Sequence, residues 1–200
     1  ESGRRAALVL IAPAIVASRR LGPPSVKRRS VIARAVGALT KLVVTRWPFR
    51  IFVRRLVLAK DFWPRGLGAT YGERARQDTD NVNEYAKRYA RAAGVVGWER
   101  GLLAFCAARL EQVLNALLTG DSIEARLSNA LASSSTPLDR VLVVNGIDDQ
   151  LVPVANARRL VGNLRTSAPA ASVELVEIAG AGHCPHEEGD VSEIVGNFIK

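Results

Sequence analysis

The sequence predicts an α/β fold with parallel strands, and two observations carry this prediction. Short β-branched runs at residues 141–144 and 172–178 alternate with amphipathic helical patterns at residues 154–164 and 191–200. Residues 6–12 form a further continuous apolar run, which is typical of a parallel strand buried on both faces. Strands and helices that alternate at short spacing indicate βαβα units. We therefore expect functional groups in the loops at the carboxyl ends of these strands.

The patterns divide the chain into three segments. Residues 1–17 would supply one core strand, residues 18–136 a helical cap or lid, and residues 137–200 the other strands and helices of the core. The long middle segment has no internal repeat and no strand pattern. We therefore predict a core that is interrupted by one large helical insertion.

Helix signals recur within the insertion. Residues 78–93 begin with polar residues and are followed by Gly94, and residues 98–118 end near Gly120, as capped helices do. Prolines should break or begin helices, because they lack the backbone N–H and fix φ. These prolines are Pro23, Pro24, Pro48 and Pro64.

The composition restricts the class of protein. Of the 200 residues, 48% are hydrophobic and 24% are charged, which excludes a wholly disordered or fibrous chain. No apolar run reaches the ~18 residues of a membrane-spanning helix. Two cysteines, Cys106 and Cys184, cannot form a disulfide framework. We see no signal peptide, and because the chain begins at Glu1 and contains no methionine, we expect it to be part of a longer product.

The positive charge is concentrated near the start of the chain. Residues 2–60 hold fourteen Lys or Arg and no Asp or Glu, so with Glu1 this stretch is +13, and the total of +9 leaves −4 for residues 61–200. Within it, residues 31–43 have apolar side chains at helical spacing with Arg28, Arg29, Arg34 and Lys41 between or before them. Such a helix is a membrane-surface element, a lid over an apolar cleft, or an ordinary solvated surface helix. Nucleic acid is not expected, because few aromatic residues interleave the basic ones and no binding motif is present.

Two loops carry the candidate catalytic residues. The loop after residues 141–144 contains Asp149, and the loop after residues 172–178 contains His183. If the two strands are neighbours, a carboxylate and an imidazole meet at one edge of the sheet. The carboxylate would accept the Nδ1 proton and stabilise the imidazolium that forms when Nε2 takes a proton. A satisfied structural histidine is the alternative interpretation.

These loops resemble the acid and base loops of the α/β-hydrolase superfamily. The patterns are G-x-x-D-x-x-V-P and G-x-G-H-x-x-H-x-E, each after a strand. They are made by Gly146, Asp149, Val152 and Pro153, and by Gly180, Gly182, His183, His186 and Glu188. The resemblance implies a partial α/β-hydrolase fold comprising the C-terminal portion, with residues 18–136 as the cap. The sequence Gly-His-Cys-Pro-His-Glu resembles that of plant and algal members of the superfamily, some of which cleave the phytyl ester of chlorophyll derivatives.

The resemblance also implies roles for individual residues. Asp149 would be the triad acid, with Asp148 as the second choice, and His183 would be the general base. His186 would be a structural loop group, which Glu187 or Glu188 could pair with, or these carboxylates could cap the last helix.

Other uses of these residues are weaker. Cys184 as a nucleophile would stand on the wrong loop for this family, and Cys106 on an apolar helix is interpreted as packing. A zinc site formed by His183, Cys184 and His186 is not expected, because these ligands are crowded and lack a fourth. No cofactor or metal is predicted.

The nucleophile of the family is missing from the sequence. None of its serines stands in a G-x-S-x-G elbow, and the oxyanion-hole loop is absent too. We therefore expect a longer protein in which an upstream Ser or Asp attacks an ester, an epoxide or a related bond of an apolar substrate, and we expect this chain to be inactive alone. Tyr71, Tyr85 or Tyr89 could act as lid donors in epoxide chemistry.

One non-enzymatic alternative remains open. A degenerate hydrolase-like module could bind an anionic membrane surface or a partner through the basic stretch of residues 2–60. The sequence does not determine the compartment, although the plant and algal resemblance would allow a chloroplast.

Overall fold

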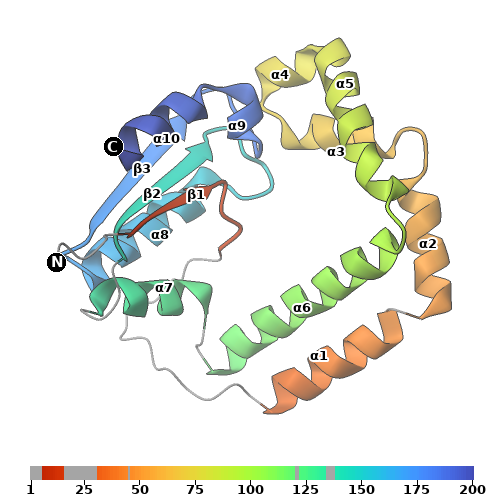
Figure 1. Cartoon of the computed structure of the whole chain (residues 1–200), viewed down its shortest axis with the longest axis horizontal. Coiled ribbons are helices and arrows are strands. Elements are labelled where there is room, and N and C mark those ends of the chain that lie inside the picture. The colour runs from red at the N-terminus through yellow and green to blue at the C-terminus, as the bar shows by residue number, and fades with distance from the viewer. Residues whose placement is uncertain (1–5, 16–30, 45, 120–121, 134–137) are drawn as a thin grey trace. The chain divides into compact units, whose positions relative to one another are not determined.

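The computed structural model describes residues 6–15, 31–44, 46–119, 122–133 and 138–200, which form two compact units (Figure 1). The sheet unit comprises Glu1–Pro24, Ala69–Asp78 and Ile123–Lys200. The helical unit comprises Ser25–Gly68 and Thr79–Ser122. Residues 69–78 thus belong with the sheet, although they lie far from the other sheet residues along the chain.

The sheet unit is built on three parallel strands in the order β1-β2-β3. The strands are β1 (Ala6–Ile11), β2 (Leu138–Gly146) and β3 (Ser172–Ile178). Their predicted parallel pairing is confirmed. β2 extends beyond residues 141–144 on both sides, since Arg140 pairs with Ser172 and Gly146 with Ile178. The carboxyl ends of β2 and β3 therefore lie side by side at one edge of the sheet.

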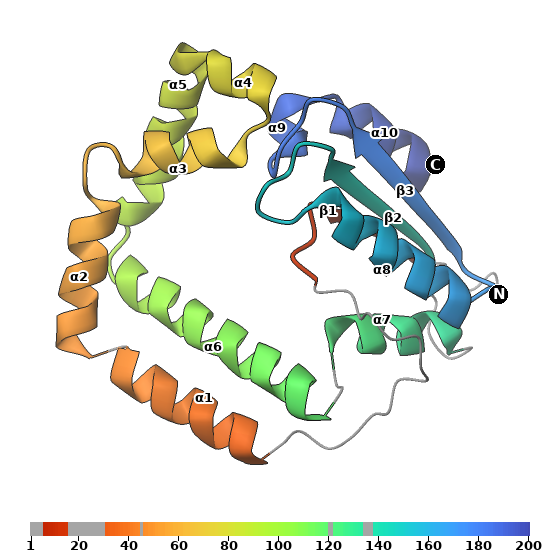
Figure 2. The ribbon, with the colours of Figure 1, turned by 180° about the vertical axis from the view of Figure 1, so that it is seen from behind.

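Helices cover both faces of this sheet. α8 (Val154–Ser167) and α7 (Ile123–Ala132) pack on one face and α10 (Val191–Ile199) on the other, and α8 lies behind the sheet in Figure 1 but in front of it in Figure 2. Successive side chains of β2 alternate between the two cores, as the strand period requires. One core includes Val141, Val143, Leu160 and Leu164, and the other Leu142, Val144, Val191 and Phe198.

β1 is less buried than its apolar sequence predicts. Val9 is partly buried, and Ile11 is 39% exposed. The physical reason is position: β1 pairs with β2 along one edge, and no other strand of the described chain pairs with its second edge. The expectation of a strand buried on both faces is therefore wrong for β1 in this structure, while β2 fulfils it.

The helical unit consists of long helices joined by short turns. They are α1 (Val31–Val44), α2 (Trp47–Val57), most of α3 (Phe62–Thr70), α5 (Thr79–Ala90), a 3₁₀ turn (Arg91–Gly94) and α6 (Trp98–Thr119). Pro48 and Pro64 lie in the first turns of α2 and α3, where a missing N–H costs no helical hydrogen bond. Pro23, Pro24, Arg28 and Arg29 lie outside the described residues.

α1 and α2 pack against α6. The buried face of α6 is formed by Glu99, Leu103 and Ala107, which follow each other at four-residue intervals and so lie on one face. Cys106 falls off this face and is exposed, so its interpretation as a packing residue is wrong. α1 approaches α6 closely at Gly37, where an added Cβ would lie 2.7 Å from the Glu111 Cβ.

Candidate functional site

The loop between β2 and α8 is folded around the carboxylate of Asp149. Its Oδ1 accepts hydrogen bonds from the backbone N–H groups of Leu151 (2.9 Å) and Val152 (2.8 Å). Such side-chain to backbone bonds are the reason Asp is favoured in turns. The side chain of Asn145, which is fully buried, adds hydrogen bonds to the carbonyls of Gly146 and Val152. One oxygen of Asp149 is thereby fixed by the loop, and Oδ2 is left for another partner.

That partner is His183, in the loop after β3. Its Nδ1 lies 2.9 Å from Asp149 Oδ2, so the predicted meeting of these two side chains is confirmed. A carboxylate at Nδ1 favours the tautomer with the proton on Nδ1, which leaves a lone pair on Nε2. The Asp149 side chain is wholly buried, whereas that of His183 is 26% exposed. Asp148 is exposed, and Asp149, not this neighbour, holds the imidazole.

Glycines allow three segments to meet at this point. A Cβ on Gly146 would lie 2.1 Å from the Gly182 oxygen, and one on Gly182 would lie 2.2 Å from the Thr70 oxygen. A Cβ on Gly72 would lie 2.0 Å from the Gly180 oxygen. Real Cβ atoms do not approach backbone atoms so closely. The acid loop, the His loop and residues 70–72 therefore pack backbone to backbone.

Residues 70–72 are also bonded directly to the His loop. The backbone N–H of His183 donates to the Thr70 carbonyl at 2.6 Å. Glu188, on the short helix α9 (Pro185–Glu188), accepts from the backbone N–H of Gly72 (2.7 Å) and of Gly182 (2.9 Å) with its two oxygens. These bonds hold Gly182, the residue before His183, beside Gly72, which is 116 positions away from Glu188 along the chain.

Glu187 makes the second bond from α9 to this segment. Its Oε2 accepts from the hydroxyl of Tyr71 at 2.6 Å, and Tyr71 is only 3% exposed. Burial raises the pKa of Glu188 above its ordinary value, and the backbone N–H groups of Gly72 and Gly182 counteract this in part. Of the two alternatives for these carboxylates, capping of the last helix is wrong, because Asp190 is the N-cap of α10 and accepts from Glu193 N.

These contacts with residues 70–72 were not foreseen from the sequence. The sequence offered Glu188 only nearby partners, His186 or the last helix, and no pattern pairs a carboxylate with a backbone N–H over such a distance. The glycines at 72, 180 and 182 are the one available signal, because glycine allows the close approach of two backbones.

Two further candidate residues, His186 and Cys184, lie in the same loop region as His183. His186 is half-exposed, with Nε2 3.9 Å from Glu187 Oε1, and Cys184 is buried at the start of α9. Within the described part of the chain, no group of three or more His, Cys, Asp or Glu residues is arranged to hold a metal ion.

The arrangement is suited to proton transfer. An imidazole that is held at Nδ1 by a buried carboxylate and is partly exposed can accept a proton at Nε2 and return it. Any reacting group would have to come within hydrogen-bonding distance of that nitrogen. The catalytic roles of Asp149 and His183 stay predictions.

Comparisons with known proteins give a limited result. No family model matches the chain, and no curated protein matches it. Among solved structures, the chain is similar to MGS-M2, described as an α/β hydrolase enzyme from a Medee basin deep-sea metagenome library, with a TM-score of 0.45 and 15% sequence identity. The alignment covers 96% of this chain and 55% of that one, so the chain spans about half the length of that protein.

Proposed function

We propose that this chain supplies the acid and the base of a hydrolase of the α/β-hydrolase superfamily. The observation that carries the proposal is the 2.9 Å contact between Asp149 Oδ2 and His183 Nδ1, made by two loops at the carboxyl ends of adjacent parallel strands. The two motifs and their order along the chain support the same class. In this proposal the nucleophile belongs to a part of the protein outside these 200 residues.

The proposed chemistry follows from the free nitrogen of His183. Nε2 takes the proton of a serine hydroxyl as its oxygen attacks the ester carbonyl, and Asp149 stabilises the resulting imidazolium. The proton then passes to the departing alcohol, which leaves an acyl group on the serine. Nε2 next deprotonates a water molecule, which releases the acid and regenerates the serine. If the nucleophile is Asp, His183 acts only in the second step.

An apolar substrate is part of the proposal. The sequence Gly-His-Cys-Pro-His-Glu resembles plant and algal members of the superfamily, some of which act on phytyl esters, and this resemblance favours an apolar ester as the substrate. A long-chain or phytyl ester is therefore the proposed substrate class.

The test uses the longer protein that carries the nucleophile, with p-nitrophenyl esters of short and long acyl chains. We expect His183→Ala to lower turnover by three or more orders of magnitude, as loss of a triad base typically does. His186→Ala is the matched control and should keep most of the activity. Undiminished turnover by His183→Ala would reject the proposal, and so would measurable hydrolysis by the 200-residue chain alone.

A further inference from the structure

One helix of the helical unit exposes an apolar stripe. In α2, Phe49, Phe52 and Leu56 are 42%, 64% and 47% exposed and follow each other at intervals of three and four residues, so they lie on one face. Soluble proteins expose single apolar residues freely, but a contiguous row of large ones marks an interaction surface. The three side chains lie within one helix of the helical unit.

The opposite face of α2 has its own electrostatic partner. Glu99, at the start of α6 and only 1% exposed, accepts a hydrogen bond from Arg50 at 2.7 Å and lies 3.6 Å from Arg54. Packing of α2 on α6 thus uses the arginines of the inner face. Val57 is buried on the same side at 5% exposure. The outer apolar stripe is therefore not needed to hold the helix in place.

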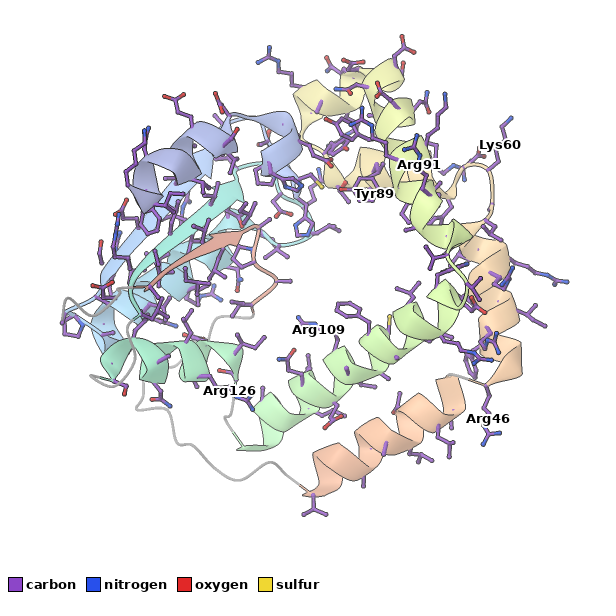
Figure 3. All side chains as sticks on the ribbon, in the orientation of Figure 1. Arg46, Lys60, Tyr89, Arg91, Arg109 and Arg126 are labelled. Carbon is purple, nitrogen blue, oxygen red and sulfur yellow. The ribbon has the colours of Figure 1, made fainter. Side chains whose placement is uncertain are left out.

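Basic side chains border the stripe. Arg46, Arg55 and Lys60 are exposed. Figure 3 shows Arg46 extending away from α6 and Lys60 extending from the turn that follows α2. No Asp or Glu occurs between residues 2 and 60. The outer surface of α2 is accordingly apolar along its middle and positive at its border.

The helix before α2, which is α1, also exposes apolar side chains. Val31, Leu39 and Leu42 of α1 are 77%, 61% and 53% exposed, whereas Gly37, on the side toward α6, is buried. Two consecutive helices therefore expose apolar side chains in the stretch without acidic residues. None of the described helices is long and apolar enough to cross a bilayer, so any membrane contact made by these helices would be at the surface.

We propose that the outer surface of α2, continued by α1, docks on the surface of an anionic lipid bilayer. Phe49, Phe52 and Leu56 would enter the boundary between headgroups and acyl chains, and Arg46, Arg55 and Lys60 would lie among the anionic headgroups. Charge complementarity selects this partner. A second copy of the chain would bring two surfaces of the same positive sign together, which is unfavourable. The inference does not rest on the proposed hydrolytic function.

The test is sedimentation of the chain with vesicles of phosphatidylcholine alone and of phosphatidylcholine mixed with phosphatidylserine. We expect binding to the mixed vesicles at low salt and its loss at about 1 M salt, where the Debye length is only ~3 Å. Removing two border charges with R46Q/R55Q should weaken binding about 25-fold, since each is worth about 1 kcal/mol near the surface. The control R159Q/K200Q removes the same charge from the sheet unit and should bind like the parent.

The apolar part is tested by Phe49→Ser, Phe52→Ser and Leu56→Ser combined. We expect this variant to lose vesicle binding while keeping its circular dichroism, because the three side chains face outward. Val96→Ser, at a fully exposed apolar residue elsewhere in the helical unit, is the matched control. Equal binding to both vesicle types would overturn the proposal. Unchanged binding by the triple variant would overturn it too, as would a dimer in gel filtration that the triple variant abolishes.

Discussion

Two glutamates, the half-buried Glu188 of the sheet unit and the buried Glu99 of the helical unit, show how hydrogen-bond partners set the pKa of a carboxylate. Glu188 in the sheet unit accepts from the neutral backbone N–H groups of Gly72 and Gly182, and burial raises its pKa. Glu99 in the helical unit is bonded to Arg50, and this guanidinium holds its pKa below the ordinary value of 4.5. Burial disfavours the charged form of both glutamates, and at Glu99 the hydrogen bond from Arg50 outweighs this effect.

The units also differ in where their apolar side chains lie. Leu160 and Leu164 of α8 are wholly buried against β2, whereas Leu39 and Phe52 of the helical unit are more than half exposed. These leucines of the sheet unit belong to a packed core, whereas these two side chains of the helical unit are open to solvent. Paired substitutions in the two units test this difference.

The largest expected effect is on the core of the sheet unit. Leu160→Ala should lower the free energy of unfolding by about 2–5 kcal/mol, because it removes buried contacts and leaves a cavity. Leu39→Ala, at 61% exposure, should change it by no more than about 0.5 kcal/mol. Hydrogen exchange of the β2 amides reports on the sheet unit, and tryptophan fluorescence reports on the helical unit, which holds Trp47, Trp63 and Trp98. Equal losses in the two variants would contradict the contrast.

A smaller loss is expected where the loops meet. Gly182→Ala should destabilise the sheet unit by about 1–3 kcal/mol, since its Cβ would lie 2.2 Å from a backbone oxygen and force the loops apart. Gly162→Ala in α8 meets nothing within 4 Å and should stabilise the helix by about 0.5–1 kcal/mol. Denaturant unfolding, followed by the same β2 amides, measures both. A neutral Gly182→Ala would disprove the close packing of the three segments.

The pH dependence should have opposite signs in the two units. Because the pKa of Glu99 is lowered on folding, its contribution to stability is present above pH 4.5 and is lost as the pH falls through the folded-state pKa. Because the pKa of Glu188 is raised, its contribution is present below pH 4.5 and is lost as the pH rises through the folded-state pKa. Glu99→Gln should reduce the loss of stability at acid pH that tryptophan fluorescence detects in the helical unit. Glu188→Gln should reduce the loss of stability toward neutral pH that hydrogen exchange of the β2 amides detects in the sheet unit. An unchanged pH dependence of stability in both variants would contradict these roles of Glu99 and Glu188.

The sequence predicted those parts of the structure that depend on local pattern. Residues 172–178 form the predicted strand because their alternation suits a pleated, half-buried segment, and the loop motifs correctly brought Asp149 to His183. The contacts of Glu187 and Glu188 with residues 70–72 were missed, because they depend on the tertiary approach of two backbones. The exposure of Cys106 was missed for a similar reason, since the α6 face that packs is set by its neighbours α1 and α2.

The central claim is that Asp149 fixes the tautomer of His183, and nitrogen-15 NMR of the imidazole tests it most directly. The chain has only two histidines, so His186→Gln leaves a single signal to assign. In the neutral imidazole we predict a proton on Nδ1 and a bare Nε2. In Asp149→Asn, the carbonyl oxygen must stay on the N–H groups of Leu151 and Val152, so the amide NH₂ should face His183 and move its proton to Nε2. A proton on Nε2 in the parent chain, unaffected by Asp149→Asn, would contradict the account.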